Sequence, residues 1–221
     1  MGRNNLMASI KLLGDTSGEI IISAPAVAGT NTLTLPATSG TLLDSTSSSV
    51  GLHTINIPAG ALTTRTTNGA AGGTVETTTN KLMLKTLDFD AATEEYAQFT
   101  VRMPKSWDEG TVTAYVQWSH AATTTNFGVT WGLQAVAISN DDALDVAFGT
   151  GQVIADTGGT TDDLYQTAVT PAITVGGTPQ ELDYITFQVY RSVADGGDTM
   201  AIDARLHGVV LMYTTDAATD A

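Results

Sequence analysis

Residues 111–118, TVTAYVQW, alternate polar with apolar side chains, and the apolar set ends at Trp118. Successive side chains of an extended strand point to opposite faces of a sheet, so this period of two is typical of a strand with one buried face. Residues 127–135, FGVTWGLQA, show the same period, with the apolar side chains at the odd positions. Both stretches therefore predict β-strands that bury one face in a core.

Further runs of strand-forming residues lie on both sides of these two stretches. The candidate strands cover residues 81–89, 95–103, 110–119, 127–138, 144–155, 164–175, 182–193 and 200–214. Thr makes up about a sixth of the chain, which favours strands over helices. With Gly, Asp, Asn and Pro between the runs, we expect an all-β chain whose distal part is a jelly-roll-like β-sandwich. Single helical turns are expected at most at 106–110 and 140–148.

The N-terminal part has a different pattern. Residues 18–43, GEIIISAPAVAGTNTLTLPATSGTLL, hold short apolar pieces separated by turn residues, each shorter than an ordinary strand. Such pieces can be buried if several copies wind around one axis, so we expect an extended, intertwined stalk or anchor. The residues expected at the trimer axis are Ile20, Ile22, Val27, Leu33, Leu35 and Leu42. The predicted domains are an anchor at 1–50, a linker at 51–56 and the sandwich at 57–221.

Two segments resemble a known family. APAVAGTNTLTLPATSGTLL, residues 24–43, resembles a segment near the N-termini of tailed-bacteriophage fibre and appendage proteins. IPAGALTTRTTNGAAGGT, residues 57–74, is similar to the start of the distal β-domain of phage virion proteins. The resemblance implies a homotrimeric, non-enzymatic protein of the virion surface, assembled in the host cytoplasm. Its implied partners are further copies of itself and capsid, neck or tail components, and head, neck and tail all remain open as its location.

Charge excludes two classes of partner. Asp and Glu number 23 against 9 Lys and Arg, which gives a formal net charge of −14. A basic stripe that could neutralise phosphates is missing from the sequence, so we expect neither nucleic-acid binding nor attraction to an anionic membrane. No run approaches eighteen apolar residues, so membrane insertion is not expected either.

Catalytic motifs are absent from the sequence. It contains no G-x-S-x-G elbow, phosphate-binding loop, H-E-x-x-H or cysteine, so no catalytic residue is assigned and we expect no enzyme. In a depolymerase, scattered carboxylates would be the only candidate catalytic groups. His53, His120 and His207 stand far apart without metal-ligand spacing, and we expect each at the surface or an interface.

One acidic loop is a candidate site for a cofactor, calcium. Asp141, Asp142 and Asp145 fall in a single loop, and calcium takes six to eight oxygen ligands from such side chains and from carbonyls. The spacing does not match an EF-hand, and turns favour Asp for local hydrogen bonds in any β-protein. Calcium at this loop is therefore the weaker interpretation, and no other cofactor is expected.

Tryptophans bear on ligand binding. Trp118 and Trp131 fall on apolar strand faces and are expected in the core. Trp107 lies in the charged turn PKSWDEG, where it could be an exposed stacking platform, a subunit contact or a cap on the end of the sandwich. Residues 63–80 and 120–127 have the composition of contact segments.

These expectations predict one function and one alternative. The preferred function is that of a non-enzymatic bacteriophage structural protein, a short homotrimeric fibre or capsid decoration. The alternative is the tip of a tail fibre that binds a host receptor or surface carbohydrate.

Overall fold

The computed structural model describes residues 9–13, 17–23, 51–121, 127–217 and 220. The chain divides into two compact units, residues 1–42 and 43–221. In the first unit, β1 (Ser9–Leu13) pairs with antiparallel β2 (Glu19–Ser23), and Ile20 and Ile22 belong to β2. The other expected axis residues lie outside the described residues: Val27, Leu33, Leu35 and Leu42.

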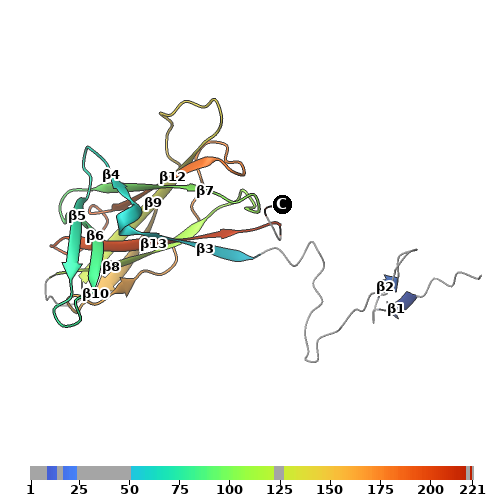
Figure 1. Cartoon of the computed structure of the whole chain (residues 1–221), viewed down its shortest axis with the longest axis horizontal. Helices are drawn as coiled ribbons and strands as arrows, with labels where there is room; N and C mark the ends of the chain where they lie inside the picture. Colours follow the sequence, from blue (N-terminus) through green and yellow to red (C-terminus); the bar gives the residue numbers. More distant parts are fainter. Residues whose placement is uncertain (1–8, 14–16, 24–50, 122–126, 218–219, 221) are drawn as a thin grey trace, which may run out of the picture. The chain divides into compact units, whose positions relative to one another are not determined.

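The second unit is built almost entirely of strands (Figure 1). They are β3 (Leu52–Pro58), β4 (Thr63–Thr64), β5 (Ala71–Glu76), β6 (Met83–Phe89), β7 (Tyr96–Arg102), β8 (Thr113–Ser119), β9 (Phe127–Ile138), β10 (Gln152–Gly158), β11 (Tyr165–Gln166), β12 (Tyr184–Arg191) and β13 (Ala204–Thr214). The helical content of the described residues is one 3-10 turn, Ala59–Ala61. No helix in this part of the chain is long and apolar enough to span a membrane.

Two antiparallel sheets make up the sandwich. Sheet I has the order β10-β9-β12-β7-β4, and sheet II has the order β11-β8-β13-β6-β5 with β3 beside the second half of β13. The predicted all-β class and jelly-roll-like sandwich are confirmed by this arrangement of two sheets.

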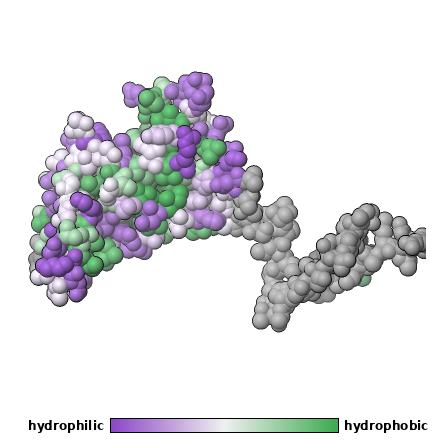
Figure 2. Space-filling model, viewed as in Figure 1, coloured by the Kyte–Doolittle hydropathy of each residue, from purple (hydrophilic) through white to green (hydrophobic). Residues whose placement is uncertain are grey.

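The core lies between the sheets and follows the period of two. Trp118 from β8 and Trp131 from β9 are both fully buried, as the apolar alternation predicts. Trp131 meets Phe89 edge to face at 5.2 Å, and Phe99 stacks on Phe187 at 5.0 Å between ring centres. Such aromatic pairs contribute beyond the area that they bury. Figure 2 shows hydrophobic residues gathered in the middle of the visible face of the sandwich and hydrophilic residues toward its ends.

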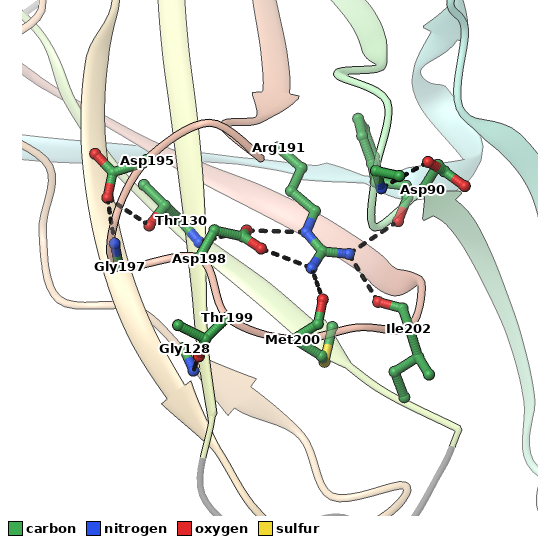
Figure 3. A network of polar contacts seen from close by, with 12 residues as sticks. Asp90, Gly128, Thr130, Arg191, Asp195, Gly197, Asp198, Thr199, Met200 and Ile202 are labelled. Carbon is green, nitrogen blue, oxygen red and sulfur yellow. Dashed lines mark hydrogen bonds and ion pairs between the residues drawn. The ribbon is translucent and has the colours of Figure 1, made fainter.

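A buried ion pair fastens the segment between β12 and β13 (Figure 3). The Arg191 guanidinium donates from Nε and Nη2 to the Asp198 carboxylate, at 2.9 and 2.7 Å. Its remaining N–H groups reach backbone carbonyls, among them those of Met200 and Ile202. Asp198 also accepts from the backbone N–H of Thr130 at 3.0 Å. A paired and fully hydrogen-bonded arginine is the form in which burial of this charge is tolerated.

Several strand predictions differ from the structure. The prediction at 127–138 is confirmed residue for residue by β9. The predicted strand at 144–155 is wrong over 144–151, where a loop precedes β10. Within the predicted strand at 164–175, only the two residues of β11 are in a strand. The predicted linker at 51–56 is also wrong over residues 52–56, because these form β3 and pair with β13.

Candidate functional site

The outward face of sheet I carries a regular set of polar and aromatic side chains. On β7 and β12 the odd-numbered residues point to the core, so the even-numbered residues point outward. These outward residues are Tyr96, Gln98, Thr100 and Arg102 on β7, and Tyr184, Thr186, Gln188 and Tyr190 on β12. We call this surface the Tyr–Gln face.

Strand register arranges the Tyr–Gln face in rows across the sheet. Tyr96 lies opposite Tyr190, which lies opposite Gly132 of β9. Next comes a row of glutamines, Gln98–Gln188–Gln134, followed by Thr100–Thr186–Val136 and Arg102–Tyr184–Ile138. Directly opposed residues on one face are close enough for their side chains to interact. The face therefore groups rings at both ends of a band of amides and hydroxyls.

Tyr190 lies against the sheet because its neighbour is a glycine. A Cβ on Gly132 would stand 2.2 Å from Cζ, 2.4 Å from Cε2 and 2.7 Å from Cε1 of Tyr190. Three contiguous ring atoms at similar distances mean that the glycine meets a face of the ring and not its edge. The opposite face of the ring is therefore directed away from the sheet. Burial raises the pKa of Tyr190, so its phenol stays protonated at neutral pH.

Tyr96 is held by its own polar partners. The Arg65 guanidinium carbon lies 4.2 Å from the Tyr96 ring centre, a cation–π contact. The Tyr96 hydroxyl donates to the Glu94 carboxylate, and this hydrogen bond raises the pKa of Tyr96. The Tyr96 and Tyr190 rings are 5.9 Å apart and inclined by 43°. Both rings are thus placed before any ligand arrives.

The glutamine row supplies oriented amides. Gln98 Nε2 donates to Gln188 Oε1 at 2.8 Å, and Gln188 is only 2% exposed. Because Gln188 is almost fully buried, this bond fixes the amide of the more accessible Gln98. An amide group carries both a donor and an acceptor, which suits neighbouring hydroxyl groups that also do both.

A hollow of about 600 Å³ lies at the far end of the face. Arg102, Ile138 and Tyr184 form one side, and Leu144 and Leu182 line it from the loops. Tyr184 is 49% exposed, and Arg102 Nη1 donates to the Leu182 carbonyl at 2.7 Å. The loop between β9 and β10, which contains Leu144, projects from the top of the sandwich in Figure 1.

Together these rows offer a surface for a neutral, hydroxyl-rich ligand. Ring faces pack against apolar C–H surfaces, while amides, hydroxyls and an arginine hydrogen-bond to the edges of the same ligand. Sugar rings have both kinds of surface. The rows extend across sheet I, so the face suits an extended chain of such rings.

Trp107 does not belong to this surface. It is 1% exposed within its own chain, its backbone bridges to Thr215, and its side chain belongs to the core. The hypothesis of an exposed platform or subunit contact is therefore wrong, and Trp107 closes the end of the sandwich. The local charges of PKSWDEG indicate exposure, but residue 107 forms a backbone bridge with residue 215, more than a hundred positions later, and its ring is in the core.

The expected calcium ligands lie in the loop after β9, and all are exposed. The Asp142 carboxylate accepts from the Ser139 backbone N–H at 3.0 Å, and Asn140 donates to Asp141 at 2.7 Å. Asp145 is in the same loop, and within the described ranges no group of three or more His, Cys, Asp or Glu could hold a metal ion. Calcium binding at this loop stays an untested prediction.

The three histidines differ in environment. His53 is exposed on β3, beside the ring of Tyr213. His120 is fully buried, with its ring edge to face with Phe127 at 4.7 Å, so the expectation of a surface position is wrong. His207 is half-buried on the outward face of sheet II, as its strand pattern predicts.

Comparison with known proteins identifies no family. No family model and no curated protein matches the chain. Among solved structures, it is similar to the CBM22-1–GH10 modules of a Clostridium thermocellum endo-1,4-beta-D-xylanase complexed with xylohexaose, at 10% identity and TM-score 0.42 over 72% of this chain and 28% of that one. A CBM22-2 xylan-binding domain from Paenibacillus barcinonensis matches at 10% identity and TM-score 0.42, over 72% of this chain and 98% of that one. A family 11 carbohydrate-binding module from Clostridium thermocellum matches at 10% and 0.38, over 77% and 99%.

Proposed function

We propose that the sandwich is a non-catalytic carbohydrate-binding module whose ligand lies along the Tyr–Gln face. The observation that supports this most is the Tyr190 ring, held against Gly132 with its other face turned outward. A ring fixed in this way loses little conformational entropy when a sugar stacks on it. The fixed amide of Gln98 stands in the next row, within reach of the hydroxyls of the same sugar.

Charge narrows the ligand to a neutral glycan. The chain carries a formal net charge of −14, which repels acidic polysaccharides at low salt. Arg65 stacks on Tyr96, and Arg102 donates from one nitrogen to the Leu182 carbonyl. Uncharged polysaccharides meet no such repulsion.

Replacing Tyr190 by alanine is expected to weaken binding to a soluble neutral polysaccharide by about fivefold to thirtyfold, because about 1–2 kcal/mol of ring contact is lost. Affinity electrophoresis against a panel of neutral polysaccharides measures this, with circular dichroism to show that the fold is kept. Tyr115→Ala on the outward face of sheet II is the matched control and should bind as wild type. If Tyr190→Ala and wild type migrate alike in every gel that retards wild type, the Tyr–Gln face is not the binding site.

A virion role for the whole chain is our second proposal, and it rests on the resemblance of residues 24–43 to phage fibre segments. The division of the chain into two compact units, residues 1–42 and 43–221, is compatible with an anchor that carries a binding module. In that case the protein would be a homotrimer that displays its sandwich on the particle for attachment to a host glycan.

Light scattering tests the trimer. We expect the full chain to have three times the mass of one protomer, and a version that starts at Gly51 to be monomeric, because the predicted axis residues precede that point. A full chain that is monomeric at micromolar concentration would contradict self-assembly through the N-terminal part.

A further inference from the structure

A second hollow, of about 380 Å³, lies on the outward face of sheet II, across the sandwich from the Tyr–Gln face. It is bounded by the end of β5, by β6 and by the loop before β11, over the last part of β8 and the first half of β13. Its size is at the small end of the range for ligand pockets, about 300–1,000 Å³. It therefore suits a small ligand and not a polymer chain.

Three apolar side chains form its walls. Val75 of β5 lies opposite Leu84 of β6, and both point outward from the sheet. Leu164, just before β11, is 63% exposed and lines the hollow from the other side. Exposed aliphatic side chains that converge on one hollow are typical of a site that takes an apolar group.

Three polar side chains line its base. Gln117 and Ser119 come from β8, and His207 comes from β13. His207 Nε2 and Ser119 Oγ are 2.8 Å apart, within hydrogen-bond distance. Burial lowers the pKa of His207, and so does Arg205, while Asp88 acts in the opposite direction. His207 is thus neutral at pH 7.

Both carboxylates at the rim already have cationic partners. Asp162 pairs with Arg205 at 3.0 Å, and Glu76 pairs with Lys81 at 3.0 Å. With these charges compensated and His207 neutral, the hollow offers no unpaired charge among its described lining residues. It therefore suits an uncharged ligand.

We infer that this hollow is a second binding site, for a small neutral ligand with an acetamido group, such as an N-acetylated amino sugar. An acetamido group needs an acceptor for its N–H, a donor for its C=O and an apolar wall for its methyl group. The Gln117 amide supplies both polar partners, and the Ser119 hydroxyl adds a third. Val75 and Leu84 supply the wall. The site is on the other sheet and does not depend on the proposed polysaccharide-binding role.

Titration of the full-length protein with N-acetylglucosamine, followed by the imidazole proton signals of His207 in NMR spectra, tests this site. We expect saturable shifts with N-acetylglucosamine and none with glucose, which lacks the acetamido group. Gln117→Leu keeps the volume but removes the amide, and should weaken binding by about tenfold or more, because both hydrogen bonds of the amide are lost. Gln134→Leu, the same change on the Tyr–Gln face, should have no effect.

Two outcomes would overturn the inference. One is that glucose and N-acetylglucosamine shift the His207 signals equally, and the other is that neither shifts them. Tyr190→Ala should leave this titration unchanged, so failure here and failure of the polysaccharide experiment are separate results.

Discussion

Replacing Arg191 by methionine is expected to lower the free energy of unfolding by about 3–5 kcal/mol, the usual cost of removing one partner of a buried ion pair. Methionine fills much of the same space, but it leaves the Asp198 carboxylate buried without its two charged donors. The carbonyls of Met200 and Ile202 lose their donors as well. Urea unfolding, followed by tryptophan fluorescence, measures the change.

Lys81→Met is the matched control for this experiment. Lys81 and Glu76 also form an ion pair, but their side chains are 66% and 51% exposed. Exposed pairs contribute about 0–1 kcal/mol, so this variant should unfold close to wild type. Equal small losses in both variants would show that the Arg191 network does not hold the segment between β12 and β13.

Gly132→Ala is expected to abolish or strongly weaken polysaccharide binding while the sandwich stays folded. The added methyl group would stand 2.2 Å from Tyr190 Cζ, so the ring must leave its place on the sheet. A partly exposed tyrosine can swing toward solvent, so the cost to stability should be small beside the loss of the stacking surface. The ring proton shifts of Tyr190 report the displacement directly, even without a ligand.

Gly72→Ala provides the comparison. Gly72 is also a strand glycine, in β5, but a Cβ there meets nothing within 4 Å. This variant should bind as wild type and be unchanged or slightly more stable, because alanine restricts the unfolded chain. If the Gly132→Ala variant binds polysaccharide as tightly as the Gly72→Ala variant, the position of the Tyr190 ring against residue 132 is not required for binding.

Local periodicity was enough to predict both ends of β9, because its odd-numbered residues are all buried in the core. Periodicity did not predict β5, AGGTVE, because its two glycines give a weak strand signal. That strand is specified by its pairing with β6, which no single stretch of sequence displays. The opposite error occurred at 144–151, where a strand was predicted from the apolar composition. These residues form a loop, in which Leu144 is 84% exposed.

The Tyr–Gln face could be predicted only in part. The alternation of Gln98, Thr100 and Arg102 with apolar residues is visible in the sequence and indicates an outward polar face. What the sequence does not display is the register that sets Gln98 against Gln188, ninety positions later. Tyr190 and Gly132 likewise come from separate strands. The Tyr–Gln face is assembled from three strands by long-range pairing, whereas the tryptophans that the sequence singled out are buried.

The pairing of β3 with β13 bears on how this sandwich could be used as a building block. Leu52 lies opposite Thr214, and the Thr215 N–H donates to the Gly51 carbonyl at 3.1 Å. The first and last strands of the sandwich therefore begin and end one hydrogen bond apart. A domain with adjacent ends tolerates circular permutation and insertion into a surface loop of another protein. The sandwich therefore has the end geometry that insertion into a loop of a carrier protein requires, provided that the segment after β13 is kept, since the Asp216 N–H donates to the Ser106 carbonyl at 2.9 Å.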